Sequence, residues 1–217
     1  NIDTVYQRVL AIANKEQRGY ITPLEFNLYA NQAQMDIFEQ YFYDLNQFRR
    51  LPGNDSKYAD MVDVLEDKLT HFKRGPVSVT NGSWVHNIDD DLYRITDLNF
   101  EGKILEEIRY EDYYKLQTPL TKPSTSRPVF WKKDGEIHWE GVNGAVAVHW
   151  IRRPVKVEWN SLGTGLYVSG VDFELHDSEE TKLVIKILGL AGITLKDPAL
   201  YQIAGAEDNK SIQQEKQ

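Results

Sequence analysis

The 217-residue sequence predicts an α+β fold with an N-terminal helical bundle, an antiparallel β-rich middle and C-terminal helices that end in a polar tail. The prediction rests on two changes in the spacing of apolar residues. They recur every three or four positions at the start, alternate or become β-branched in the middle, and return to helical spacing near the end. We expect one structural unit with parts at 1–74, 75–175, 176–205 and 206–217, the C-terminal helices packing on the first part.

Three helices are expected before residue 75. Val5, Val9 and Ile12 mark the first, with Asp3 as its N-cap. The second begins with a capping box of Thr22 and Glu25 around Pro23 at the first helical position. It continues for about seven turns with apolar residues on two faces, which indicates cover on more than one side. The following residues form this stripe: Phe26, Ala30, Ala33, Ile37, Tyr41, Leu45 and Phe48, with Met35, Phe38 and Phe42 beside them.

The third helix, over 57–72, places Met61, Leu65, Leu69 and Phe72 on one face and is expected to end at Gly75-Pro76. A C-terminal helix follows Asp177 and Glu180, which stand in capping-box register. Leu183 and Ile187 form its apolar stripe. A last helix is expected from Asp197-Pro198, with an apolar stripe that fades after Ala206.

The middle of the chain contains two tight-turn signals. Asp134-Gly135 is typical of a type I′ hairpin, and Asn143-Gly144 of a second corner, so 129–151 is expected to form an antiparallel meander. Residues 110–117 suggest a short helix. The 117–127 segment reads as a polar loop, and 163–170 as an exposed flexible segment.

Composition restricts the function. The net charge of −8 and the pI near 5.2 argue against duplex DNA as the main partner, because phosphate contacts require a basic face. The absence of cysteine excludes disulfides, thiolate metal sites and a cysteine nucleophile. The first residues lack the pattern of a signal peptide, and no run of about 18 apolar residues occurs, so we expect no membrane partner. The lack of cysteine favours a protein made and used in the cytosol, whereas one that works outside the cell would need non-covalent stabilisation such as oligomerisation.

No motif indicates catalysis. The five histidines include no pair at the i, i+4 spacing of a helical zinc site, and the run at 89–91 lacks the glutamate of a calcium loop. Nucleophile-elbow and phosphate-loop patterns are also missing from the sequence. We therefore expect no catalytic, cofactor-binding or metal residues, and a protein that is not an enzyme.

An arginine pair ends the most strand-like segment of this acidic chain. Pro154 favours an extended Arg153, and adjacent residues on a strand point to opposite faces. Arginine forms paired hydrogen bonds with carboxylates, so the pair suits a contact with another acidic subunit, although a solvated strand end explains it as well. Our candidate residues for a subunit or portal interface are Arg152, Arg153, Trp159, Tyr167, Lys210, Ile212 and Gln213.

The order of these parts resembles a known family. The helical start "NIDTVYQRVLAIANKEQRGYITPLEFNLYANQAQMDIFEQYF", the strand "VAVHWIRRPVKVEW", the segment "DFELHDSEETKLVIKILGLAGI" and the tail "KSIQQEKQ" are similar to head-to-tail connector proteins of tailed bacteriophages, the portal-adaptor or neck ring proteins. The likeness is greatest to those of short-tailed, crAss-like phages.

That resemblance implies a structural role in the virion, in a ring assembled in the bacterial host cytoplasm. Such rings commonly contain twelve copies, dock on the portal protein, contact the next tail or ring protein, and pass genomic DNA through their lumen. The family has no catalytic residues or cofactors. The tail from about residue 206 is too polar to hold a helix by core packing, so we expect it to order by docking on the portal or on a neighbouring subunit.

Two other functions remain open on the sequence alone. One is a different phage structural role, such as a head-completion or tail-tube protein. The other is a small-molecule or glycan-binding module. Such a module would use an exposed tryptophan face, and the candidate residues are Trp131, Trp139, Trp150 and Trp159.

Overall fold

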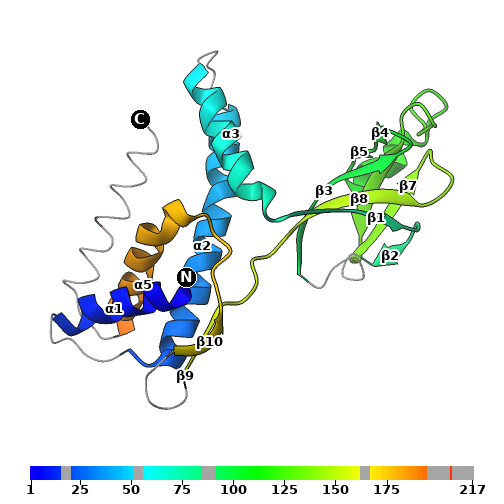
Figure 1. Cartoon of the computed structure of the whole chain (residues 1–217). Helices are drawn as coiled ribbons and strands as arrows, with labels where there is room; N and C mark the ends of the chain where they lie inside the picture. The colour runs from blue at the N-terminus through cyan, green and yellow to red at the C-terminus, as the bar shows by residue number, and fades with distance from the viewer. Residues whose placement is uncertain (16–20, 51–55, 85–90, 162–166, 195–205, 207–217) are drawn as a thin grey trace. The chain divides into compact units, whose positions relative to one another are not determined.

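A computed structural model describes residues 1–15, 21–50, 56–84, 91–161, 167–194 and 206 (Figure 1). It confirms the predicted α+β class, with helices at the N-terminal and C-terminal ends and sheets between them. The chain divides into two compact units. We call residues 1–71 with 154–217 the helical unit, and residues 72–153 the β unit.

The helical unit is built around one long helix. This helix, α2 (Pro23–Arg50), packs against α3 (Ser56–Thr70) and α5 (Glu180–Thr194), and α5 also contacts α1 (Ile2–Lys15). A short helical turn, η3 (Asp177–Glu179), precedes α5, and the strands β9 (Glu158–Ser161) and β10 (Tyr167–Val171) form a two-stranded ribbon in the same unit. The buried side chains on α2 include Phe26, Ala30, Ala33, Ile37, Phe38 and Tyr41.

The start of α2 has the predicted capping box. The Glu25 carboxylate accepts the Thr22 backbone N–H at 2.9 Å, and the Thr22 hydroxyl oxygen accepts the Glu25 N–H at 3.3 Å. Ile21 and Phe26, which flank the box at the hydrophobic-staple positions, are both buried. The local sequence therefore sets both the first residue of the helix and its direction of entry into the core.

Thr22→Ala should lower the free energy of unfolding of the helical unit by about 1 kcal/mol, because it removes one half of this box. Chemical denaturation followed by circular dichroism would measure the change. Thr22→Ser retains the acceptor oxygen and serves as the control. Equal losses in the two variants would contradict a capping role for the hydroxyl.

Two predicted caps are wrong. Helix α1 begins at Ile2, and the Asn1 side chain accepts the Asp3 backbone N–H at 2.8 Å, so Asn1 takes the role predicted for Asp3. At the C-terminal helices, the His176 ring accepts the Ser178 N–H at 3.2 Å in place of the predicted box of Asp177 and Glu180. In both cases a polar residue nearer the N-terminus, two positions before Asp3 and one before Asp177, meets the free backbone N–H groups.

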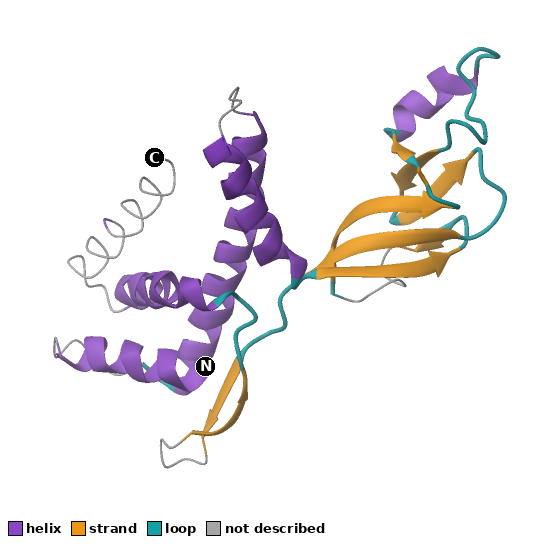
Figure 2. Ribbon diagram, turned by 45° about the horizontal axis from the view of Figure 1, so that its top comes forward, coloured by secondary structure: helices purple, strands orange, loops and turns teal. Residues whose placement is uncertain are grey.

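The β unit consists of two four-stranded sheets that share a core (Figure 2). The first has the order β1-β8-β3-β4, with β1 (Lys73–Val79), β8 (Val146–Arg152), β3 (Leu92–Phe100) and β4 (Lys103–Ile104). The second has the order β2-β7-β6-β5, with β2 (Ser83–Trp84), β7 (Glu136–Glu140), β6 (Val129–Lys133) and β5 (Glu106–Glu107). The pairs are antiparallel except β5 with β6. Helix α4 (Tyr110–Tyr113) and the turn η2 (Tyr114–Gln117) confirm the predicted short helix.

The predicted meander over 129–151 is only half right. The hairpin of β6 and β7 forms, and its turn residues Asp134 and Gly135 have φ angles of 52° and 83°, as a type I′ turn requires. Strand β8, however, pairs with β1 and β3 in the other sheet. The corner at Asn143-Gly144 therefore carries the chain between layers, because both β7 and β8 must bury one face in the shared core.

The units also differ from the expected parts. Gly75-Pro76 lies inside β1 rather than ending a helix, because α3 already stops at Thr70. Strands β9 and β10, which were assigned to the β-rich part, belong to the helical unit. The β unit is thus an insertion of 72–153 into the helical unit.

Residues 72–153 expressed alone are expected to fold cooperatively. The Arg152 N–H donates to the Phe72 carbonyl at 3.0 Å, so the ends of this fragment are adjacent, and ten buried residues form its core. Far-UV circular dichroism with thermal melting would check the result. A matched fragment that stops at residue 145 lacks β8, which is central in its sheet, and should not melt cooperatively. Indistinguishable melts would contradict the insertion.

Candidate functional site

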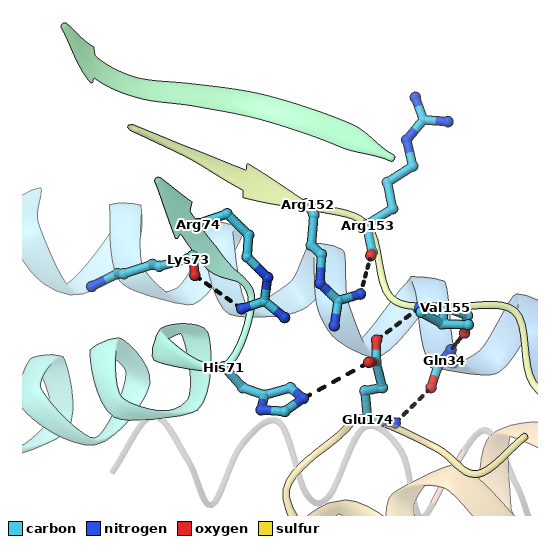
Figure 3. A network of polar contacts seen from close by, with 8 residues as sticks. All are labelled: Gln34, His71, Lys73, Arg74, Arg152, Arg153, Val155 and Glu174. Carbon is cyan, nitrogen blue, oxygen red and sulfur yellow. Dashed lines mark hydrogen bonds and ion pairs between the residues drawn. The ribbon is translucent and has the colours of Figure 1, made fainter. Parts of the chain in front are cut away.

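The two arginines of the predicted interface differ in exposure. Arg152 is the last residue of β8, its side chain is 9 % exposed, and its Nη1 donates to the Arg153 carbonyl at 3.1 Å (Figure 3). Arg153 is exposed, and its backbone N–H donates to the Asp91 carbonyl at 2.7 Å. The pair thus points to opposite sides, as strand alternation predicts. Arg153 is the member that a carboxylate on another molecule can reach.

After Pro154 the chain runs extended along α2 and hydrogen-bonds to a row of amide side chains. Asn31 donates to the Val157 carbonyl at 2.9 Å and accepts the Val157 N–H at 2.9 Å. Asn27 makes the same double contact with Trp159, at 3.2 and 2.8 Å. A primary amide offers one donor and one acceptor side by side, like the edge of a β-strand. The helix therefore acts as a partner strand for alternate residues of this segment.

Gln34 extends the amide row towards the return of the chain from the β unit (Figure 3). Its side chain donates to the Val155 carbonyl at 2.9 Å and accepts the Glu174 N–H at 3.2 Å. The Glu174 carboxylate in turn accepts the Val155 N–H at 2.8 Å, and its other oxygen lies 3.8 Å from Nε2 of His71. The Glu174 carboxylate thus contacts both ends of the break in the helical unit: His71, the last residue before the β unit, and Val155, just after it.

Trp159, another predicted interface residue, is part of the core of the helical unit. It is 1 % exposed, its indole N–H donates to the Asp3 carboxylate at 3.0 Å, and its ring centroid lies 4.2 Å from that of Tyr6. The contact explains why Asp3 does not cap α1. The side chain serves folding and presents no surface to a neighbouring subunit.

The remaining interface candidates are less defined. Tyr167 is the first residue of β10 and pairs with Ser161 in the ribbon. Lys210, Ile212 and Gln213 lie outside the described residues, as do the 206–217 tail apart from Ala206 and most of the expected last helix.

The amide row was missed at the sequence level. Asn27, Asn31 and Gln34 stand at spacings of four and three on α2, so their helical phase places them on one face. That pattern could have identified a polar stripe beside the apolar one. Its partner was not recognisable, because the segment it binds lies more than 120 residues later in the chain.

A second group that the sequence did not single out is an aromatic cluster on the β unit. The ring centroids of Tyr113 and Trp131 lie 4.2 Å apart, and those of Trp131 and His138 lie 5.9 Å apart, with the latter rings nearly parallel. Tyr110 and Tyr114 share a hydroxyl hydrogen bond of 2.8 Å. The cluster ties α4 and η2 to the β6–β7 hairpin and leaves Tyr114 exposed.

The pKa values of two tyrosines in this cluster are shifted in opposite directions. The hydrogen bond from Tyr114, together with the ammonium of Lys133, lowers the pKa of Tyr110 from its usual value. Partial burial raises the pKa of Tyr113, and the nearby Glu140 carboxylate adds to the effect. The same hydroxyl hydrogen bond and ring contacts tie α4 and η2 to the hairpin, so the arrangement is suited to packing and hydrogen bonding.

The charge of the chain is divided unevenly between the two units. The β unit contains twelve acidic and twelve basic residues, so it is formally neutral. The helical unit therefore carries the entire net charge of −8. A surface of this sign repels polyanions and other copies of itself wherever its carboxylates are exposed.

Across the ranges given above, no three His, Asp or Glu side chains come together in a way that would hold a metal ion. None of the helices in those ranges is both long and apolar enough to cross a membrane.

Comparison with known proteins adds no relative. No protein-family model matches the chain, and no curated protein sequence matches it significantly.

Proposed function

We propose that this chain is a structural protein of a bacteriophage virion, where it forms a ring that joins the portal to the tail and surrounds the passage of the genome. It acts without catalysis or cofactor. The ring is assembled in the cytoplasm of the bacterial host, most simply from twelve copies, and contacts the portal protein and the next tail or ring protein. The order of helical start, β-rich middle and helical return supports the proposal, because it is the order on which the resemblance rests.

The observation that carries the proposal is the charge division. DNA adsorbs to proteins by exchanging its counterions for basic side chains, so a passage for sliding DNA should lack a basic surface. The helical unit, with the whole charge of −8, meets that requirement. In the assembled ring we therefore expect the helical unit to face the lumen. A lumen lined mainly with lysine and arginine would contradict this.

The structure bears differently on the two alternative functions, a ligand-binding module and another phage structural role. A ligand-binding module would need tryptophans on an exposed face, but the four candidate tryptophans are buried, at 8 % exposure or less. The structure therefore offers no support for that alternative. The residues concerned are Trp131, Trp139, Trp150 and Trp159. A head-completion or tail-tube role shares the same class and differs only in position within the virion.

The proposal is tested by mass and by location. Native mass spectrometry of the purified chain, alone and with a portal ring, should show a closed species of many copies. Electron microscopy of the virion should place it between portal and tail. A chain that remains monomeric under both conditions and is absent from the neck would refute the proposal, whereas a ring elsewhere in the virion would favour the head-completion or tail-tube role.

Deleting residues 206–217 is expected to impair ring assembly while leaving the fold intact. The expectation follows from the polar composition of the tail, which cannot hold a helix by core packing. Size-exclusion chromatography with light scattering measures assembly, and thermal melting measures folding. A scrambled tail of the same composition is the matched control. Normal assembly of the truncated chain would show that the tail is not a docking segment.

A further inference from the structure

The exposed cations of the β unit differ in whether they are paired. Five of them lie between residues 113 and 133, a stretch without a carboxylate, and each forms an ion pair with an acidic residue outside it. Lys73, Arg94 and Arg153 are also exposed, but their side chains form no ion pair or hydrogen bond within the ranges that the structure describes. In a chain rich in carboxylates, these three cations therefore stand apart.

The three cations lie on one face of the first sheet. Lys73 of β1 and Arg94 of β3 both pair with Ile151 of β8, one from each side, and paired residues of adjacent strands point to the same face. Arg153 follows Ile151 by two positions and shares its side by strand alternation. The neighbouring position, Trp150, belongs to the core, so the Ile151 side is the outer face. We call Lys73, Arg94 and Arg153 the cationic face.

Carboxylates are present near the cationic face but do not pair with it. Asp97 lies on the same side of the sheet, opposite His149. Asp91, just before β3, accepts the Arg153 N–H through its backbone carbonyl. In the part of the chain that the structure describes, which excludes residues 89 and 90, neither carboxylate forms an ion pair with the three cations. Their guanidinium and ammonium donors are therefore available to a carboxylate on another molecule.

Complementary carboxylates occur on the helical unit. Asp63 and Asp67 of α3 stand one turn apart, and both are exposed. Neither makes an ion pair with any other described residue, and Lys68 beside them pairs with Glu179 instead. Arginine binds carboxylates through charge-assisted hydrogen bonds, so two exposed aspartates are suitable acceptors for the cationic face.

A second copy of the chain is the partner that these observations favour. Within one copy, the cationic face and the α3 aspartates form no ion pair across the described ranges, so neither group satisfies the other. Each copy carries both groups, so a contact between them can repeat from one subunit to the next. DNA is disfavoured, because the helical unit carries the entire charge of −8 and repels a polyanion.

We propose that the cationic face of one copy binds Asp63 and Asp67 of its neighbour. The inference rests on the proposed ring and names the surfaces through which one subunit meets the next. Because two different patches meet, the contact is heterologous, the kind that closes into a ring when the rotation between subunits allows it. It also lets acidic subunits associate, since the formally neutral β unit of one copy meets the acidic helical unit of the next.

The test reverses the charge on each side of the contact and then on both. Lys73→Glu with Arg94→Glu reverses two positions of the cationic face, and Asp63→Lys with Asp67→Lys reverses α3. A fourfold variant combines the two changes and restores opposite charges across the contact. Sedimentation of the full chain over a concentration series, alone and with a portal ring, measures assembly, and circular dichroism measures folding.

The matched control is Lys115→Glu with Lys122→Glu. It makes the same change of charge at cations of the β unit that are 76 % and 58 % exposed and lie outside the cationic face. If the reversal at Lys73 and Arg94 disturbs the fold, the neutral variant Lys73→Gln with Arg94→Gln takes its place, since it removes the cations without adding carboxylates.

Each reversal should raise the concentration needed for half-assembly by at least about tenfold, because like charges then face each other across the contact. The fourfold variant should return to within about threefold of the unmodified chain, since the two changes are coupled. The control should assemble like the unmodified chain. Raising the salt from about 0.1 M to about 1 M should also weaken assembly, because the screening length falls from about 10 Å to about 3 Å.

The outcomes separate the contact from the ring. If the reversals assemble like the control, or if each weakens assembly and the fourfold variant does not restore it, the inference is overturned and the ring stands. The inference also fails if the cationic-face reversal leaves assembly unchanged but abolishes binding of a labelled DNA duplex. If the unmodified chain forms no assembly, the inference and the ring both fail. If it forms open filaments that the reversals dissolve and the fourfold variant restores, the contact stands and the ring fails.

Discussion

Replacing Trp159 by alanine is expected to lower the free energy of unfolding of the helical unit by about 3–5 kcal/mol, the range for deleting a large buried aromatic side chain. The indole is 1 % exposed, packs on Tyr6 and donates to Asp3. Its loss leaves a cavity between the ribbon and α1 and an unmatched carboxylate. Urea denaturation of the full chain, monitored by circular dichroism, measures the effect.

Two controls separate packing from hydrogen bonding. Trp159→Phe keeps an aromatic ring in place but removes the N–H donor, so it should cost clearly less than alanine. Asp3→Asn keeps an acceptor oxygen at the same position and should cost least. If Trp159→Ala left stability unchanged but reduced assembly, the residue would belong to an interface after all, as the sequence suggested.

Replacing Asn31 by alanine has the second largest expected effect, a loss of about 2–4 kcal/mol. The change removes both hydrogen bonds to Val157, and each backbone group left without a partner costs about 1–3 kcal/mol where water cannot replace it. The Val157 side chain is buried, which restricts such replacement. Thermal and chemical denaturation of the full chain would measure the loss.

Gln32 provides the matched control for Asn31. Its amide lies one residue further along α2 but bonds to Asp36 at the exposed surface, at 2.8 Å. Gln32→Ala should therefore change stability by only a few tenths of a kcal/mol. Asn31→Asp keeps the acceptor and loses the donor, so an intermediate effect is expected. Equal costs for Gln32→Ala and Asn31→Ala would show that the amide row contributes nothing beyond helix propensity.

Local signals in this sequence predicted local structure well. The capping box at Thr22 and Glu25 and the turn at Asp134-Gly135 formed as expected, because each depends only on residues within one turn of the chain. The apolar stripe of α2 from Phe26 to Tyr41 is buried for the same reason. Ile12, in contrast, was expected on the buried face of α1 but is exposed, since tertiary packing decides which side of a helix is covered.

The candidate interface residues were harder to judge from the sequence. The alternation of Arg152 and Arg153 follows from strand geometry and was predictable. The burial of Trp159 was not, because an aromatic residue in a strand suits a core and an interface equally well. Its position became clear only when the ribbon was found beside α1 and α2, in the helical unit.

The sequence by itself determined the α+β class, the starts and turns that short-range hydrogen bonds specify, and a net charge that disfavours DNA binding. Tertiary structure alone decided that β8 leaves the meander for a second sheet and that 72–153 is an insertion. It also revealed that amides on α2 take the place of a strand for a segment far along the chain. The physical reason is that such pairings join residues whose local preferences contain no information about one another, so only the packing of the folded chain selects them.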